Sequence, residues 1–180
     1  MTLEMKTIIL GICAGGLAVV LETLPRPRPS SRASGTPPFP GRVALALAIV
    51  AAALIAVGVV SGTLPSHLVQ ISPLVLVLAL LGPAPRLGSV AAGAVLSFWL
   101  VTMVGIWLYL LGLSRFLTGT FSPTEIALTV VIGVASLGGL TASGRVGDLP
   151  LTARVPAIVL GAGIQALALW ISYQPLVTGR

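Results

Sequence analysis

The polar residues whose spacing could support chemistry lie close together around residue 70. His67 and Gln70 are three residues apart, which places both side chains on one face of a helix, and Ser72 and Pro73 follow. A proline inside an apolar helix leaves a carbonyl oxygen free to accept a hydrogen bond, and a histidine can change its charge near neutral pH. We interpret this stretch as a small outward-facing polar site. The alternative is an interfacial histidine beside a glutamine that joins two helices through a hydrogen bond.

Gln165 is the other polar side chain that falls deep in an apolar segment. It completes the set of candidate site residues, which are His67, Gln70, Ser72 and Gln165. An amide at this depth can also serve only to join two helices. If Gln165 faces Gln70 in the folded chain, the site hypothesis gains support.

The residue sets of catalysis and metal binding are missing from the sequence. It has one histidine and one cysteine, Cys13, which cannot form a metal- or haem-ligand cluster. It has no P-loop, no dinucleotide-binding glycine motif and no pair of carboxylates within an apolar segment. We therefore predict a protein that is not an enzyme, with no catalytic residue, no cofactor and no metal.

The composition indicates which elements position the polar residues. Of the 180 residues, 56% are hydrophobic and 8% are charged, whereas a soluble domain carries about 25% charged residues. Lipid is the solvent that suits such a chain, and helices satisfy their own backbone hydrogen bonds within it. We predict an all-α polytopic transmembrane helical bundle that forms a single membrane domain over residues 1–180. Nucleic-acid binding is not expected, because the basic residues are not gathered on one face with aromatic residues.

Six apolar segments predict about six membrane helices. A perpendicular span needs about 20 residues; the second, fourth and sixth segments reach that length, whereas the first, third and fifth are short. Five spans plus one short or re-entrant segment is the alternative. The segments are Thr7–Leu21, Val43–Gly62, Leu68–Leu81, Ser89–Leu113, Ile126–Leu140 and Val155–Tyr173.

Two of these helices carry start signals in their sequence. Ser122 and Glu125 have the spacing of a capping box, with Pro123 at the first helical position. The sixth helix is predicted to start near Val155, which would place Pro156 in its tolerated first turn.

The stretch from residue 24 to residue 42 differs from the apolar segments, because it is rich in proline, serine and arginine. We predict a flexible cytoplasmic loop here, since cytoplasmic loops of membrane proteins carry an excess of basic residues. The residues that would set the topology are Arg26, Arg28, Arg32 and Arg42. The aromatic residues at the ends of the fourth and sixth segments then face outward. The alternative topology keeps the first segment from crossing, with the N-terminus inside.

The abundance of arginine, alanine and glycine suggests a bacterial chain, located in the inner (plasma) membrane.

Small residues recur at four-residue spacing, which lets helix backbones approach closely in lipid. The predicted packing residues are Gly11 and Gly15 in the first segment, Gly58 and Gly62 in the second, and Ser89, Gly93 and Ser97 in the fourth, with Ala157 and Gly161 as a further pair in the sixth.

Two functional hypotheses follow from these observations. The first is an accessory or structural subunit that packs against other membrane subunits, or against itself, in the lipid bilayer; it fits the small-residue spacing and the scarcity of buried charge. The second is a small transporter or channel for a neutral or small polar solute, which fits the polar stretch at His67 and Gln70.

Overall fold

The computed structural model describes residues 11, 40–115, 119–144 and 149–178, and the regular structure of these residues is entirely helical. Four of the helices are long and apolar enough to cross a membrane, namely α2, α4, α5 and α6, whereas α3 has 17 residues. The chain therefore has the helices of a multi-pass membrane protein. The described residues include four candidate spans and the shorter α3, which does not confirm the predicted count of about six. The helices are α2 (Pro40–Val60), α3 (Leu64–Leu80), α4 (Pro85–Leu110), α5 (Pro123–Ser143), α6 (Leu151–Ser172) and α7 (Pro175–Thr178).

The segment predicted as the first helix lies outside the described residues except for Gly11. Gly15 and three of the four topology-determining arginines, Arg26, Arg28 and Arg32, also lie outside them. The fourth, Arg42, is helical, because α2 begins at Pro40. The predicted loop boundary at residue 42 is therefore too late.

The start of α5 confirms the capping box. Ser122 Oγ accepts a hydrogen bond from the Glu125 N–H at 3.3 Å, and Glu125 Oε2 accepts one from the Ser122 N–H at 2.7 Å. This helix has 21 residues and reaches spanning length. The prediction that the fifth segment is short was wrong, because polar Thr124 and Glu125 extend the helix beyond its apolar part.

Pro156 does not lie in the first turn of its helix, contrary to the prediction. Helix α6 begins at Leu151 after Pro150, so Pro156 is an interior residue. Pro156 is exposed on the surface of the bundle.

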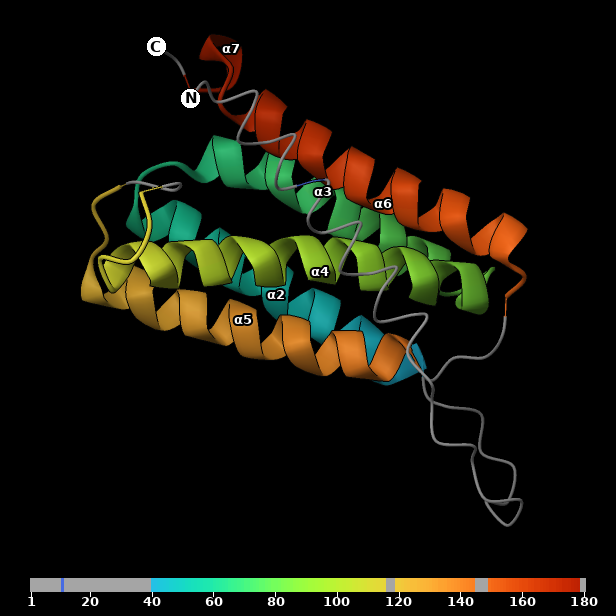
Figure 1. Cartoon of the computed structure of the whole chain (residues 1–180). Coiled ribbons are helices and arrows are strands. Elements are labelled where there is room, and N and C mark those ends of the chain that lie inside the picture. Colours follow the sequence, from blue (N-terminus) through green and yellow to red (C-terminus); the bar gives the residue numbers. More distant parts are fainter. Residues whose placement is uncertain (1–10, 12–39, 116–118, 145–148, 179–180) are drawn as a thin grey trace.

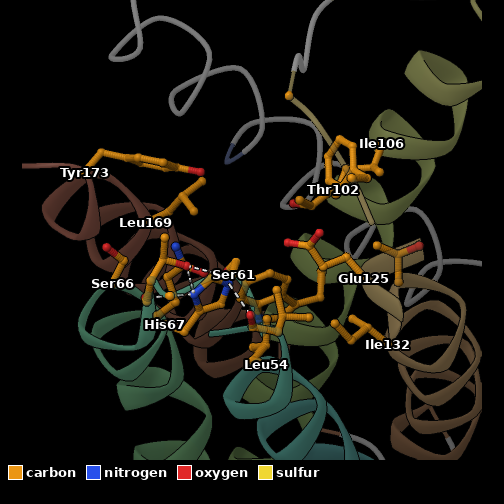
Figure 2. Close-up of a pocket in the computed structure, with 18 of the residues that line it drawn as sticks. Leu54, Ser61, Ser66, His67, Thr102, Ile106, Glu125, Ile132, Leu169 and Tyr173 are labelled. Atoms are coloured by element: carbon orange, nitrogen blue, oxygen red, sulfur yellow. Dashed lines mark hydrogen bonds between the residues drawn. The ribbon is translucent and has the colours of Figure 1, made fainter. Parts of the chain in front are cut away.

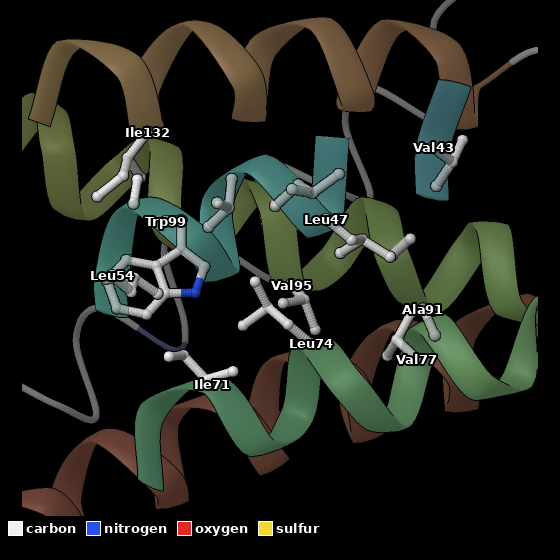
Figure 3. Close-up of a cluster of buried hydrophobic side chains, with 14 of the residues drawn as sticks. Val43, Leu47, Leu54, Ile71, Leu74, Val77, Ala91, Val95, Trp99 and Ile132 are labelled. Carbon is white, nitrogen blue, oxygen red and sulfur yellow. The ribbon is translucent and has the colours of Figure 1, made fainter. Parts of the chain in front are cut away.

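Helix α4 lies at the centre of the bundle. It contacts α2, α3, α5 and α6, and these four also contact one another in the order α5, α2, α3, α6 (Figure 1). Every residue from Gly88 to Trp99 is buried, which means that all sides of this part of α4 are covered by protein. Figure 3 shows Leu47, Leu74 and Val95 from three helices meeting in the main core cluster.

Glycines of α4, α5 and α6 lie where neighbouring helices approach most closely. A Cβ atom at Gly139 would lie 2.6 Å from both Ala46 Cβ and Leu96 Cδ1. A Cβ at Gly161 would lie 3.1 Å from the Ala91 carbonyl oxygen. Larger residues at these two positions would push the helices apart.

The predicted packing residues mostly lie in such contacts. A Cβ added to Gly11 would be 3.2 Å from Ala166 Cβ, and one added to Gly93 would be 3.0 Å from Ser143 Oγ. Ser89 and Ser97 are fully buried in α4.

Gly62 is the exception, and its assignment to helix packing was wrong. It lies after the end of α2 with a φ of +67°, and a Cβ there would meet nothing within 4 Å. The Gly62 N–H donates to Val59 O and the Thr63 N–H to Gly58 O, which is the Schellman arrangement that ends a helix. The glycine is needed for the left-handed backbone of this turn.

Candidate functional site

A cavity of about 560 Å³ opens between the helices at one end of the bundle. We call this the cavity end; it contains the end of α2, the start of α3, the end of α4, the start of α5 and the end of α6. The opposite end, which carries Arg42, Arg86 and Arg154 at the starts of α2, α4 and α6, is called the arginine end. In Figure 1 the α2–α3 turn marks the cavity end.

The deep part of the cavity is apolar. Leu54, Trp99, Met103 and Ile132 line it and are buried in the core cluster. The indole N–H of Trp99 has no hydrogen-bond partner among the described residues, although a buried indole N–H normally has one. Apart from this one donor, Leu54, Met103 and Ile132 offer dispersion contacts only.

Hydroxyl groups and the imidazole of His67 form a polar rim on the α2–α3 side. Ser61 Oγ lies 2.5 Å from Thr63 Oγ1, which in turn lies 3.1 Å from His67 Nδ1. His67 Nδ1 is also 3.1 Å from the Thr63 carbonyl oxygen. The rim thus presents groups that can donate or accept hydrogen bonds.

Gly58 determines where this rim lies. A Cβ at Gly58 would be 3.0 Å from Leu64 Cα and 3.1 Å from His67 Cβ. The first turn of α3 can therefore fold back directly onto the last turn of α2, which brings His67 to the cavity.

Gln70 lines the cavity and also joins α3 to α6. Its Nε2 donates to Ser172 Oγ at 2.8 Å, and its backbone oxygen accepts from Gln165 Nε2 at 3.1 Å. Gln165 is fully buried, and its Oε1 has no partner among the described residues. Gln165 does face Gln70, as the site hypothesis required. The two hydrogen bonds, however, are of the kind that joins neighbouring helices. The functional role of both residues stays a prediction.

Ser72 does not belong to this cluster. It is exposed on the outer face of α3, and its Oγ donates to the Val69 carbonyl oxygen at 2.7 Å. That oxygen is the one that Pro73, four residues later, cannot bond because proline has no N–H. The carbonyl predicted to be free for water or a ligand is therefore bonded by the hydroxyl next to the proline.

The wall opposite His67 is formed by α4 and α5. Figure 2 shows Glu125, Thr102 and Ile132 there, facing His67 and Leu169 across the cavity. Thr129 lies one turn below Glu125 in α5 and accepts a hydrogen bond from Trp107 Nε1 at 3.0 Å.

The sequence analysis did not identify the cavity residues of this wall. Glu125 was assigned a structural role at the start of its helix, and Trp99 and Thr102 had no signal beyond their place in an apolar helix. Their spacing of three residues could have placed Trp99 and Thr102 on one helix face, but nothing in the spacing shows that this face meets a cavity. Within the described residues, no three His, Cys, Asp or Glu side chains are grouped as they would be around a metal ion.

The fold and the cavity define the class: a small multi-pass helical membrane protein with a mostly apolar cavity, rimmed by polar groups, at one end of the bundle. No protein-family model, no curated protein and no solved structure matches this chain.

Proposed function

We propose that the protein is a small transporter or channel whose cavity takes up a small solute with an apolar body. The observation that carries this proposal is the cavity of about 560 Å³, with buried apolar residues inside and hydrogen-bonding groups at its rim. Such a combination of apolar walls and a few convergent polar groups is typical of small-molecule sites. The His67 rim would orient the polar part of the solute, and Trp99 and Ile132 would contact its apolar part.

The accessory-subunit hypothesis stays a prediction. The small residues that suggested it have neighbours within the chain, since Gly93 approaches Ser143 and Gly161 approaches Ala91. These contacts explain the residues without a partner subunit, so the cavity is the stronger basis for a function.

The experiment measures binding of a neutral nitroxide, 4-hydroxy-TEMPO, through the fluorescence of Trp99. A Trp107→Phe/Trp170→Phe background leaves Trp99 as the single tryptophan, because the chain has three. Neither replaced residue lines the cavity, although Trp107→Phe removes the hydrogen bond from the indole N–H to Thr129, which does line it. Saturable quenching of Trp99 in detergent or nanodiscs is expected if the nitroxide enters the cavity.

Thr102→Phe in this background fills the cavity, since Thr102 is buried and lines it. Saturable quenching should be lost, and entry into proteoliposomes of a neutral solute with an apolar body, such as phenyl β-D-glucoside, should slow to the rate of empty vesicles. Thr141→Phe is the matched control. Both hydroxyls bond a carbonyl of their own helix, but Thr141 is exposed near the arginine end. Equal quenching and equal flux in both variants would contradict the proposal.

We further propose that the arginine end faces the cytoplasm of a bacterial cell, across the inner membrane. Three of the four described arginines lie there, and Arg115 lies at the other end, in agreement with the positive-inside rule. In a Cys13→Ala background, a cysteine at Thr63 should react with an impermeant thiol reagent added to whole cells, and one at Arg86 should not. The reverse labelling pattern would overturn this orientation.

A further inference from the structure

Among the described residues that line the cavity, the charged groups are of one sign. Glu125 is the acidic residue among its lining residues, and neither lysine nor arginine is present among them. Arg115 lies at the same end but is exposed and does not line the cavity. His67 and Tyr173 are the other titratable lining residues, and both are uncharged in their ordinary forms at about pH 8. The described residues that line the cavity thus carry one negative charge and no fixed positive charge.

The Glu125 carboxylate is held in place on the cavity wall. Oε2 accepts the hydrogen bond from the Ser122 N–H, which fixes the side chain across the first turn of α5. The N-terminus of a helix favours a negative charge there. The second oxygen, Oε1, faces no cation among the cavity-lining residues. Figure 2 shows the carboxyl group beside the open space between α5 and the His67 rim.

Aromatic rings supply the second feature. Trp99, Phe121 and Tyr173 line the cavity from three different parts of the chain. Phe121 is positioned by Tyr109, whose ring lies 6.2 Å away and whose hydroxyl donates to the Gly119 carbonyl oxygen at 2.9 Å. The faces of aromatic rings attract organic cations, and a carboxylate beside them adds charge complementarity.

We infer that the solute is a monovalent organic cation, an ammonium compound with an apolar body, and that Glu125 recognises its charge. This inference rests on the proposed function of the cavity. Carboxylates and phosphates would meet a carboxylate with no lysine or arginine among the described lining residues to offset the repulsion, whereas an alkylammonium group is attracted both by a carboxylate and by an aromatic face.

The experiment compares three nitroxides with the same ring: the cation 4-trimethylammonium-TEMPO, the neutral 4-hydroxy-TEMPO and the anion 4-carboxy-TEMPO. Trp99 quenching in the single-tryptophan background is expected to give a Kd for the cation about tenfold lower than for the neutral probe. The anion should bind more weakly than the neutral probe. The cation does not cross lipid readily, so its entry into proteoliposomes can be followed by electron paramagnetic resonance.

Glu125→Gln is the decisive variant, because glutamine can still complete a capping box. It should raise the Kd of the cation about tenfold and change that of the neutral probe less than about twofold. Asp148→Asn removes an acidic charge from the stretch between α5 and α6 and should change neither value. Tyr173→Leu should weaken binding of the cation more than binding of the neutral probe. Tyr173→Phe keeps an aromatic ring and should not weaken binding of the cation more than that of the neutral probe.

The outcomes separate this inference from the function on which it rests. Saturable binding of the neutral probe with equal or weaker binding of the cation would overturn the inference and leave the cavity function standing. If none of the three probes quenches Trp99 saturably, and Thr102→Phe does not alter the quenching, both the inference and the proposed function are overturned. Cation binding that is insensitive to Glu125→Gln would remove Glu125 from the recognition of charge.

Discussion

The arginine end and the cavity end are built from the same five helices but differ in the residues at the helix contacts. Towards the arginine end, Gly93 and Gly139 meet Ser143, Ala46 and Leu96 at distances that leave no room for a larger side chain. At the cavity end, the contact between α4 and α5 is made by Trp107, whose ring lies over Gly133 and whose N–H bonds Thr129.

The difference teaches how an apolar bundle obtains a cavity. Where both helices present small residues, the backbones approach and the space closes. Where one helix presents an indole, the glycine opposite it accommodates the ring, and the remaining side chains line an open space. Polar groups lie at the open end, because the helices that begin or end there have polar terminal residues.

The close helix contacts at the arginine end should be sensitive to added volume. Gly139→Leu must displace Ala46 or Leu96, and we expect it to lower the free energy of unfolding by about 3 kcal/mol, since overpacking forces backbone shifts. Gly138→Leu, one residue away and with nothing within 4 Å of its Cβ position, should leave stability unchanged. Thermal unfolding in detergent micelles measures both. Similar losses in the two variants would show that the close approach of α5 to α2 and α4 does not govern stability.

The cavity end should respond more weakly, through its helix cap. Ser122→Ala removes the oxygen that accepts from the Glu125 N–H, and loss of an N-cap costs about 1 kcal/mol. Thr124→Ala is the control in the same turn, because Thr124 is exposed and is not part of the capping box. In the same unfolding assay, the Ser122→Ala variant should be less stable than the Thr124→Ala variant. An equal stability of the two variants would argue against a stabilising role of the cap.

The smallest effect is expected for the hydrogen bond between α3 and α6. A double-mutant cycle of Gln70→Met and Ser172→Ala should give a coupling energy of about 0.6 kcal/mol, the average for hydrogen bonds between membrane helices. A second cycle of Ser72→Ala and Ser172→Ala should give no coupling, since Ser72 bonds its own helix. A coupling of zero in the first cycle would show that Gln70 lines the cavity without joining the helices.

Local sequence signals predicted a large part of the fold. The apolar segments located α2, α4 and α6, and the spacing of Ser122 and Glu125 located the start of α5. The errors came from the ends of the segments. The fourth segment ends at Leu110 rather than at Leu113, because Gly112 adopts a φ of +74° and closes the helix, as Gly62 does for α2.

The candidate site was predicted only in part. His67 and Gln70 line the cavity, whereas Ser72 points outward and Gln165 lies behind Gln70 in the interface with α6. Glu125 and Thr102 were not predicted as site residues, because their helices are adjacent to His67 only in the folded bundle.

The sequence by itself determined that the chain forms apolar helices, where α5 begins, and how the charged residues are distributed along the chain. These properties depend on the transfer of each residue into lipid and on hydrogen bonds within one turn, so neighbours in the sequence decide them. Only the tertiary structure decided that Gly139 closes one part of the bundle while Trp99 and Glu125 border a cavity at the other end. A cavity is the space that side chains of several helices leave unfilled, and that space depends on how closely the helices approach one another.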